Sequence, residues 1–430
     1  MKQNKKVLII TYYWPPSGGA GVQRWLKFAK YLPEFGIEPI ILTVDSENAS
    51  YPQIDTSLEN DISSDLKVFK TKSFEPLNLL SGLFGKKSVP YGGFTNVNKK
   101  SFLQTILRFV RGNFFIPDAR IGWNKFAYKK AKEIISEYNI DTVITTSPPH
   151  STQLIGLKLK KNLNVNWIAD FRDPWTDIYY YKDLLHTNFV KGIDKKKERQ
   201  VLEKADKIIT NCESNKTLLE NKLSDTNNNK FHVITNGFDE DDFITEIKNP
   251  KEFIITYSGT ISENYKPETF LIVLSDVKKK FPDIEFKLRM VGNVSQDIKA
   301  LIEKHNLIEI YEAVGYVQHS KLIEYLVSST ILFYIFPKTD NDKGIAGKLF
   351  EYLAARKTII GIGPKDGDSA KIMEECEAGK MFEREEEINL KEYFEMLVKS
   401  WEVKRNLNLN SKDYLKYSRK NLTQSLEEFI

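Results

Sequence analysis

The chain has 430 residues and a mass of 49.8 kDa, which exceeds what one hydrophobic core usually supports, so two domains are expected. Hydrophobic residues make up 41% and charged residues 28%, an ordinary balance for a soluble protein, and no apolar run approaches the length of a membrane-spanning helix. A net charge of +5 is too small to indicate a nucleic-acid partner.

The compartment is indicated by the cysteines and by the start of the chain. Cys212 and Cys376 lie far apart and form neither a disulfide framework nor a zinc-binding pattern, which fits a reducing compartment and predicts no metal site. The apolar run from Val7 to Ile10 is too short for a signal peptide, and no cleavage site follows it. We therefore expect a cytoplasmic protein that acts in solution or on the inner face of the membrane.

Short apolar runs alternate with helical patterns along both halves of the chain, which is typical of parallel α/β sheets. In the first half we predict a helix at about 22–35 and strands at 7–13, 39–44, 142–146 and 167–171. In the second half the predicted strands are 253–257, 285–291, 308–311, 331–335 and 358–362. The pattern predicts two Rossmann-like sheets. Turn-forming residues between them place a hinge near 236–250.

Residues 72–125 interrupt the first domain with a different composition. Aromatic and aliphatic side chains at 102–115 are interleaved with Lys99, Lys100, Arg108 and Arg111. This pattern fits a helix in a membrane interface or over a lipid-like substrate. It fits equally well a core-facing helix whose cations extend to its edge. The last thirty residues, 401–430, are mostly helical in pattern and are expected to pack on the outside of both domains.

A glycine loop follows the first predicted strand. Gly18, Gly19 and Gly21 allow the backbone to approach a ligand closely. As a dinucleotide-binding fingerprint the loop is imperfect, because Arg24 stands where the last glycine belongs. Asp45, at the end of the second strand, nevertheless leaves an NAD(P)-dependent oxidoreductase as an alternative function.

Two further loops in the first half directly follow predicted strands. His150 can meet a sugar hydroxyl there, although a lone histidine is also a common structural hydrogen-bonding group. Arg172, Asp173 and Trp175 combine a guanidinium, a carboxylate and an indole, which suits a carbohydrate or acceptor site. The alternative is an Asp–Arg ion pair capped by Trp175.

The most informative segment lies between the strands predicted at 331–335 and 358–362. Backbone amides precede Lys348 and Glu351 at the start of a crossover helix, at the carboxyl edge of a parallel sheet. Lys348 can reach a diphosphate, and Glu351 can accept hydrogen bonds from two ribose hydroxyls. An ordinary crossover helix with a surface lysine and glutamate is the alternative. The loop comprises Gly344, Ile345, Ala346 and Gly347.

Other polar residues are predicted at the same edge of the second sheet. Gly259 and Thr260 follow its first strand, and Lys266 precedes Pro267, which suits the first position of a helix. Two lysines can hold a departing diphosphate without a metal. The backbone around Tyr316, after another predicted strand, is placed to read the edge of a nucleotide base.

The order of these segments resembles that of glycosyltransferase family 4, a family with the GT-B fold. The resemblance covers nearly the whole chain and is carried by the glycine loop and by segments 147–150, 170–175, 236–238, 258–266 and 347–354. It implies two facing Rossmann-like domains with a cleft between them. We expect an acceptor domain at 1–240 with an insertion at about 72–125, a donor domain at 241–405, and a C-terminal helix at 406–430 that returns to the first domain.

The resemblance also implies the reaction. A sugar would pass from a nucleotide-diphosphate sugar, UDP-sugar in the first place, to a glycan or lipid-linked acceptor in bacterial surface polysaccharide synthesis, with retained configuration and without a metal. Contact with the membrane surface, and none with nucleic acid, is expected. The implied residues fall into three sets. The catalytic set is His150, Lys266, Lys348 and Glu351. The donor-binding set is Gly18, Gly19, Gly259, Thr260, Tyr316, Gly344, Ile345, Ala346 and Gly347. The acceptor-binding set is Arg172, Asp173 and Trp175.

Two positions depart from the family pattern. Of the two glutamates that the family commonly carries with seven residues between them, Glu351 matches the second, whereas Lys343 occupies the place of the first, which approaches the donor sugar. Thr260 stands where an arginine often follows the glycine of the diphosphate loop, and Lys348 is the candidate substitute. A non-catalytic relative with the same fold is therefore a further alternative.

Overall fold

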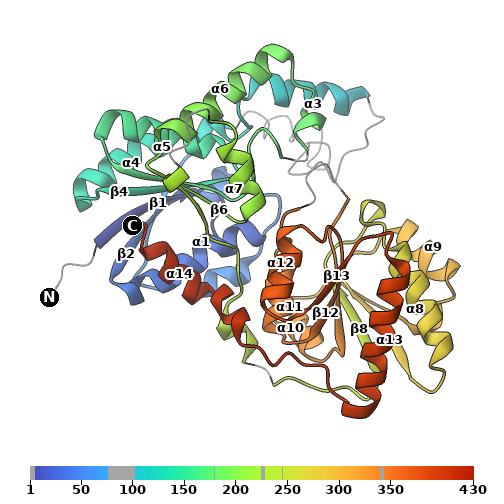
Figure 1. Cartoon of the computed structure of the whole chain (residues 1–430). Coiled ribbons are helices and arrows are strands. Elements are labelled where there is room, and N and C mark those ends of the chain that lie inside the picture. The colour runs from blue at the N-terminus through green and yellow to red at the C-terminus, as the bar shows by residue number, and fades with distance from the viewer. Residues whose placement is uncertain (1–4, 76–101, 179, 224–227, 245, 339–342) are drawn as a thin grey trace. The chain divides into compact units, whose positions relative to one another are not determined.

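The computed structural model describes residues 5–75, 102–178, 180–223, 228–244, 246–338 and 343–430 (Figure 1). The chain forms two compact units. The first contains residues 1–235 together with 422–430, and the second contains residues 236–421. Among the described residues, every helix falls short of the length or apolarity that crossing a bilayer requires.

The first unit is built on a parallel sheet with strand order β3-β2-β1-β4-β5-β6-β7 in the described part of the chain. Its strands are β1 (Lys5–Ile10), β2 (Ile37–Val44), β3 (Lys67–Thr71), β4 (Thr142–Ser147), β5 (Asn166–Phe171), β6 (Lys207–Thr210) and β7 (Phe231–Val233). Its helices are α1 (Ala20–Tyr31), α3 (Phe102–Phe114), α4 (Asn124–Tyr138), α5 (Ser151–Leu163), α6 (Asn188–Lys204) and α7 (Glu213–Glu220).

The second unit repeats this plan with the strand order β10-β9-β8-β11-β12-β13. Its strands are β8 (Phe253–Ser258), β9 (Phe286–Val291), β10 (Tyr311–Gly315), β11 (Ile331–Ile335), β12 (Thr358–Ile362) and β13 (Gly379–Phe382). Its helices are α8 (Glu268–Lys280), α9 (Gln296–Lys304), α10 (His319–Val327), α11 (Lys348–Ala354), α12 (Asp368–Glu375) and α13 (Glu387–Lys404). The last helix, α14 (Arg419–Glu427), runs across the boundary between the two units.

Both sheets are buried on both faces, which explains their continuous apolar strands. In β1, Leu8 and Ile10 belong to one core cluster, whereas Val7 and Ile9 belong to another that also contains Trp25 of α1. Successive side chains therefore point to opposite faces. Leu422, Leu426 and Ile430 complete the second of these clusters, so the end of the chain belongs to the first unit, as expected for the C-terminal helix.

Most of the strands predicted from the sequence are confirmed to within a few residues. The prediction at 308–311 is wrong, because 308–310 form a 3-10 helix and β10 begins at Tyr311. The helix predicted at 22–35 consists of α1 followed by a 3-10 turn at 32–35 that contains Pro33. Pro33 has no backbone N–H to donate to an α-helical bond, so the α-helix ends before it.

Each of the two sheets has its own topological switch point, and predicted site residues follow the strands there. In the first sheet β1 pairs with both β2 and β4, and in the second β8 pairs with both β9 and β11. At such a point the connections leave in opposite directions, which opens a ligand crevice beyond the carboxyl ends of the strands. The loops after β1 and β4 carry Gly18 and His150, and those after β8 and β11 carry Gly259 and Lys348.

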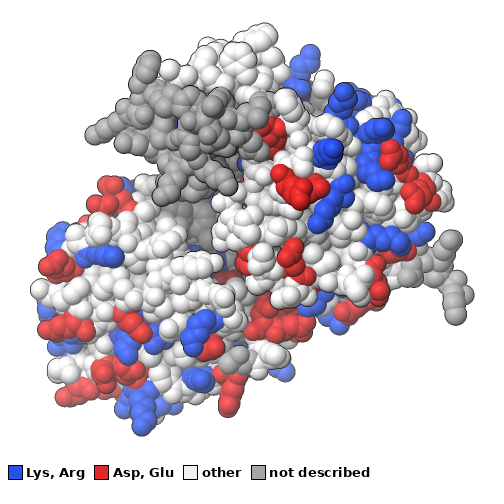
Figure 2. Space-filling model, turned by 180° about the vertical axis from the view of Figure 1, so that it is seen from behind, with Lys and Arg blue, Asp and Glu red and all other residues white. Residues whose placement is uncertain are grey.

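The arrangement of helix α3 is the reverse of one alternative from the sequence analysis, in which the apolar side chains face the core and the cations extend to the edge of the helix. Arg108 is buried, whereas Ile106 and Phe109 are each 43% exposed. The alternative in which the cations extend to the edge of a core-facing helix is therefore wrong for Arg108. The predicted cations Lys99 and Lys100 lie outside the described residues. Elsewhere, on the face shown in Figure 2, lysines and arginines are interspersed with acidic residues, a mixture without the single-sign field that attracts nucleic acid.

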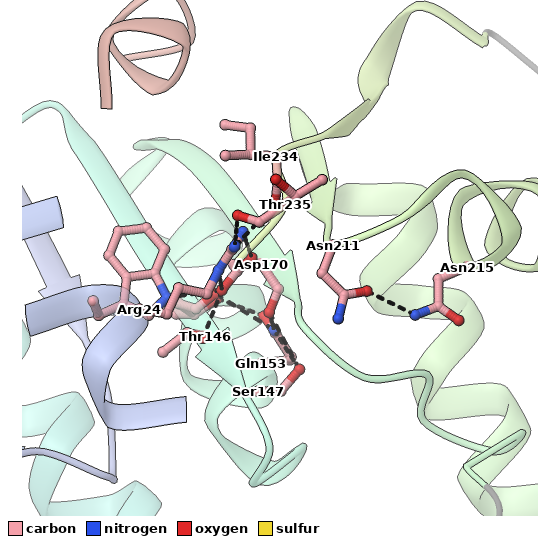
Figure 3. A network of polar contacts seen from close by, with 11 residues as sticks. Arg24, Thr146, Ser147, Gln153, Asp170, Asn211, Asn215, Ile234 and Thr235 are labelled. Carbon is pink, nitrogen blue, oxygen red and sulfur yellow. Dashed lines mark hydrogen bonds and ion pairs between the residues drawn. The ribbon is translucent and has the colours of Figure 1, made fainter. Parts of the chain in front are cut away.

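A buried ion pair ties three parts of the first unit together (Figure 3). Arg24 of α1 pairs with Asp170 of β5 at 3.0 Å, and both side chains are almost fully buried. Arg24 also donates to the carbonyls of Ile234 and Thr235 at 2.9 and 2.8 Å. The indole of Trp25 donates to the same carboxylate at 2.7 Å. Arg24 therefore replaces the fingerprint glycine for a structural reason, and Asp170 is part of the core rather than of a site.

We predict that Arg24→Met destabilises the first unit by about 3 kcal/mol or more, because the substitution leaves the Asp170 carboxylate buried without its cation. Calorimetric unfolding measures this as a lowered melting temperature. The double variant Arg24→Met, Asp170→Leu should recover part of the loss. The matched control is Lys67→Met, which removes an exposed ion pair with Glu38 and should change stability by less than about 1 kcal/mol. Equal effects of the two single variants would contradict this role of Arg24.

Candidate active site

Three glycines with positive φ end adjacent strands of the second sheet. Gly259, Gly292 and Gly315 follow or end β8, β9 and β10, with φ of 102°, 127° and 78°. The N–H of Gly259 donates to Val291 O, and that of Gly292 donates to Gly315 O, each at 2.7 Å. A Cβ at Gly292 would lie 2.4 Å from the carbonyl oxygen of Gly259. The edge of the sheet is therefore lined by backbone, because all three positions have a positive φ that favours glycine and a side chain at Gly292 would also clash.

Lys348 places a cation beside this backbone. Its Nζ donates to the hydroxyl of Tyr257 at 2.7 Å and lies 4.0 Å from the centre of that ring. A Cβ at Gly259 would lie 3.1 Å from Nζ, so the glycine leaves the space that the ammonium group occupies. Burial lowers the pKa of Lys348 to about 7, and the nearby Glu351 offsets part of that shift. Lys348 is thus poised to gain a full charge when an anion binds.

Hydrogen bonds with side chains of β11 and α12 hold the loop before Lys348 in place. The hydroxyl of Tyr334, in β11, accepts a hydrogen bond from Ala346 N at 3.1 Å and contacts Ser369 Oγ at 2.8 Å. Ser369 Oγ donates in turn to Gly344 O at 2.9 Å. Ile345 is partly buried beside them. A Cβ at Gly347 would meet no atom within 4 Å, so the fold itself does not require glycine at this position.

Glu351 has a partner that the sequence analysis missed. His319, the first residue of α10, lies with Nε2 3.1 Å from Glu351 Oε1 and with Nδ1 4.0 Å from Asp242 Oδ2. The Glu351 side chain is 24% exposed and the His319 side chain 36% exposed, so both remain accessible. A carboxylate offers about four acceptor positions, and one contact leaves capacity for ribose hydroxyls. The only sequence signal for His319 is its position after the carboxyl end of a strand.

The remaining predicted donor residues surround this site in different ways. Thr260 contributes its carbonyl oxygen, which accepts from the Tyr257 hydroxyl at 2.9 Å. Lys266 is exposed and has a φ of 50°, and Pro267 is the cap residue of α8 rather than its first residue. Tyr316 is 72% exposed just beyond β10. Lys343, at the position of the missing glutamate, forms an exposed ion pair with Asp366.

In the first unit the glycine loop is anchored to the segment that follows β2. Gly18 N donates to Gln53 O at 2.9 Å, and Asp55 N donates to Pro16 O at 2.8 Å. Gly19 has a φ of 103° and is exposed. A Cβ at Gly21 would lie 2.2 Å from Nη1 of Arg172, so this glycine leaves room for the arginine. Arg172 in turn pairs with Asp173 at 2.8 Å.

His150 is a buried, neutral imidazole. Its ring stacks on Trp175 with centroids 5.3 Å apart and an angle of 11° between the planes. Burial lowers the pKa of His150 to about 3, and the positive charges of Arg172 and Lys222 add to the effect. Neither ring nitrogen has a hydrogen-bond partner among the residues that the structure describes. The side chain therefore retains a donor and an acceptor for a ligand.

Trp175 supports His150 and is not an open platform for sugar. It is only 1% exposed, which argues against direct stacking on an acceptor. Its indole N–H donates to Asp194 Oδ1 at 2.8 Å, and Tyr181 donates to Asp194 Oδ2 at 3.0 Å. Burial raises the pKa of Asp194 to about 6 despite these hydrogen bonds. The sequence analysis missed Asp194, because nothing in the pattern of α6 distinguishes it from a surface residue.

Among the described residues, no group of three or more histidine, cysteine, aspartate or glutamate side chains is arranged to hold a metal ion. Asp45, the residue that supported a nicotinamide cofactor, caps a 3-10 turn through a contact with Glu47 N at 3.2 Å. With Arg24 buried in the core, the first glycine loop lacks the features of a dinucleotide site that the oxidoreductase alternative requires.

Comparison with known proteins identifies the family. The model of Glycosyltransferase Family 4 matches residues 92–242, and that of Glycosyl transferases group 1 matches residues 238–414. No curated protein sequence matches this chain.

Solved structures share the fold over nearly the whole length. Sucrose-phosphate synthase from Thermosynechococcus elongatus is 14% identical with a TM-score of 0.62, and the alignment covers 99% of this chain and 98% of the other. Anabaena HepE in complex with UDP and glucose is 12% identical, with a TM-score of 0.61 and the same coverage. A TarM variant from S. aureus, in complex with fondaparinux, alpha-GlcNAc-glycerol and UDP, is 13% identical, with a TM-score of 0.58 and 99% coverage of both chains.

These structures give this chain the GT-B fold, and the two family models together span most of its length. The chain therefore belongs to glycosyltransferase family 4 and is a nucleotide-sugar-dependent glycosyltransferase.

Proposed function

We propose that the protein transfers a sugar from a UDP-sugar to a glycan or lipid-linked acceptor, with retention of configuration and without a metal. The observation that carries the proposal is the partly buried Lys348 ammonium beside Gly259 at the switch point of the second sheet. UDP is favoured as the nucleotide because HepE and TarM, two proteins of similar fold, form complexes with it. Bacterial surface polysaccharide synthesis, on the cytoplasmic side of the membrane, is the proposed setting.

The donor would bind to the second unit. Its diphosphate would lie against Lys348, Lys266 and the backbone of Gly344 to Gly347, with Gly259 and Thr260 beside it. Glu351 would hold the ribose, and the backbone at Tyr316 would read the base. Because α11 has only seven residues, its dipole is short, and Lys348 supplies most of the positive potential. Gly18 and Gly19 remain predicted donor residues of the first unit.

The acceptor would bind to the first unit. Arg172 and Asp173 present a cation and a carboxylate next to the glycine loop, and the neutral ring of His150 can hydrogen-bond a sugar hydroxyl. Trp175 would act as a positioning residue that fixes the plane of the His150 ring. Transfer then requires the acceptor hydroxyl held by the first unit to reach the sugar held by the second.

In the proposed reaction, the bond between the anomeric carbon and the diphosphate oxygen breaks, and negative charge develops on the leaving diphosphate. Lys348 and Lys266 stabilise that charge, which is usually the largest contribution of such sites. The acceptor oxygen bonds to the anomeric carbon on the same face, and its proton passes to a diphosphate oxygen. Lys343 stands where relatives commonly have a glutamate near the sugar, so this step would proceed without that carboxylate.

Donor binding should depend on pH through Lys348. The free enzyme holds the pKa of Lys348 near 7, and a bound diphosphate raises it, so binding takes up a proton above pH 7. Affinity for UDP should therefore be greatest near pH 7 and fall by up to about tenfold per pH unit toward pH 9. Titration calorimetry at several pH values measures the slope. This pH dependence of UDP affinity should disappear in Lys348→Met. It should persist in Lys280→Met, which replaces a half-exposed lysine of α8. A slope retained in Lys348→Met would contradict the assignment.

Glu351 should determine the preference for a ribose. Glu351→Ala leaves the ribose hydroxyls without an acceptor, so UDP affinity should fall by about 1–3 kcal/mol, or roughly 5- to 150-fold. Comparing UDP with 2′-deoxy-UDP isolates the contact, because the wild-type protein should prefer UDP and Glu351→Ala should not. His319→Ala frees the carboxylate and should keep the preference. Loss of the preference in His319→Ala alone would assign the ribose to the histidine instead.

A further inference from the structure

Two buried carboxylates lie on one face of α6. Asp194 and Glu198 are four residues apart, about one helical turn, and each is only 1% exposed. The helix α6 packs beside α5, which begins directly after His150 (Figure 1). Taking a carboxylate out of water is costly, so each of the two positions must offer its acid a compensating set of contacts.

Asp194 holds the edge of the Trp175 ring. Its Oδ1 accepts a hydrogen bond from the indole N–H at 2.8 Å, and its Oδ2 accepts one from the Tyr181 hydroxyl at 3.0 Å. Because the two oxygens are held by donors from different parts of the chain, the carboxylate has a fixed plane. Packing confines the buried indole, and the hydrogen bond determines which of its edges faces α6.

The face of the same indole supports His150. The two rings are stacked, with centroids 5.3 Å apart and an angle of 11° between their planes. Both ring nitrogens of His150 are buried without a hydrogen-bond partner among the described residues. No hydrogen bond to the described part of the chain therefore sets the direction of the imidazole. The stack takes over that task, so a tilt of the indole would tilt the imidazole or break the stack.

Glu198 ties down the backbone next to Trp175. Its carboxylate accepts from Thr176 N at 3.4 Å and from Thr176 Oγ1 at 2.6 Å. It also pairs with Lys222 at 2.7 Å, whose Nζ donates to Thr176 Oγ1 at 3.0 Å. The two acids of α6 thus divide the work. Glu198 anchors the chain, whereas Asp194 sets the orientation of the ring.

We propose that Asp194 is a positioning residue for transfer to the acceptor, and that it acts through the edge of Trp175 to hold the His150 ring toward the acceptor hydroxyl. The inference rests on the proposed function and adds a residue that touches neither substrate. An aliphatic side chain would avoid the cost of burying a carboxylate, so the acid is explained by the direction that it imposes on the indole. Such control is effective, because a displacement of about 1 Å in a reacting geometry can lower the rate about 100-fold.

NMR spectroscopy tests the coupling without any substrate. The chain has six tryptophans and five histidines, so ¹⁵N labels in the indole and imidazole rings give few resonances. Trp175→Phe and His150→Phe assign the two rings by the resonances that they remove. In Asp194→Leu the indole N–H resonance should move as its hydrogen bond is lost, and the His150 resonances should move with it. Asp194→Asn keeps an acceptor oxygen for the indole and should change both much less. Unmoved His150 resonances in Asp194→Leu would overturn the proposal.

Transfer kinetics measure the consequence for the reaction. UDP-glucose is the donor, and the acceptor is the most active member of a panel of octyl glycosides of common hexoses. In Asp194→Leu, kcat/KM for the acceptor should fall by about 10- to 100-fold. UDP affinity should not change, because the proposed donor site belongs to the second unit. Asp194→Asn should retain most of the activity. Equal losses in Asp194→Leu and Asp194→Asn would overturn the proposal, since charge rather than direction would then matter.

The control Glu203→Gln replaces an exposed carboxylate of α6 and should have no effect on transfer. Calorimetric melting confirms that each variant is folded. A wild-type protein that binds no UDP and transfers to no member of the panel would contradict the proposed function, whereas the NMR result decides the role of Asp194 by itself.

A double-variant cycle tests the route through the indole. Trp175→Phe keeps an aromatic ring beside His150 and removes the N–H that Asp194 accepts. If Asp194 acts through that N–H, adding Asp194→Leu to Trp175→Phe should lower kcat/KM for the acceptor little further. Losses that multiply, as they do for independent sites, would overturn the proposal.

Discussion

The contact of the partly buried Lys348 ammonium with Tyr257 is the interaction on which the second unit's site depends. No carboxylate of the described residues lies within ion-pair distance of its Nζ, and its hydrogen bond goes to a neutral phenol. A cation in this environment loses hydration without a compensating counter-ion, and the lowered pKa expresses that cost. Under the proposed function, a diphosphate that binds beside Lys348 would supply the missing counter-charge. The site therefore suits an anion that the described residues do not supply.

The first unit treats its charges differently at the equivalent edge. Arg24 and Asp170 form an ion pair deep in the core. Together they hold β5, α1 and the backbone at Ile234 in place. Nearer the surface, burial and the positive charges of Arg172 and Lys222 keep His150 neutral. The two switch points thus differ in kind. The second presents a partly buried cation whose pKa is lowered, whereas the first presents a neutral, buried imidazole ring.

Much of the fold could be predicted from the sequence because both sheets are parallel and buried on both faces, which produces long apolar runs such as 7–10 and 331–335. The edge strands β3 and β7 were missed because they are short or carry polar residues. At the site, the positions of Lys348 and His150 after strands were informative. Tyr257, His319 and Asp194, which contact Lys348, Glu351 and Trp175 respectively, could not be predicted, since contacts between residues far apart in sequence depend on tertiary packing. The inward direction of Arg108 was likewise unpredictable, because a mixed helix pattern does not say which face is buried.

The most direct test of the account is a measurement of the pKa of Lys348 itself. Lysine side chains labelled with ¹³C can be titrated by NMR, and the Lys348→Arg variant assigns the resonance by its disappearance. The account predicts a pKa near 7 in the free protein and a higher value when UDP is bound. An ordinary lysine pKa, near 10.5, in the free protein and unchanged by UDP would contradict it.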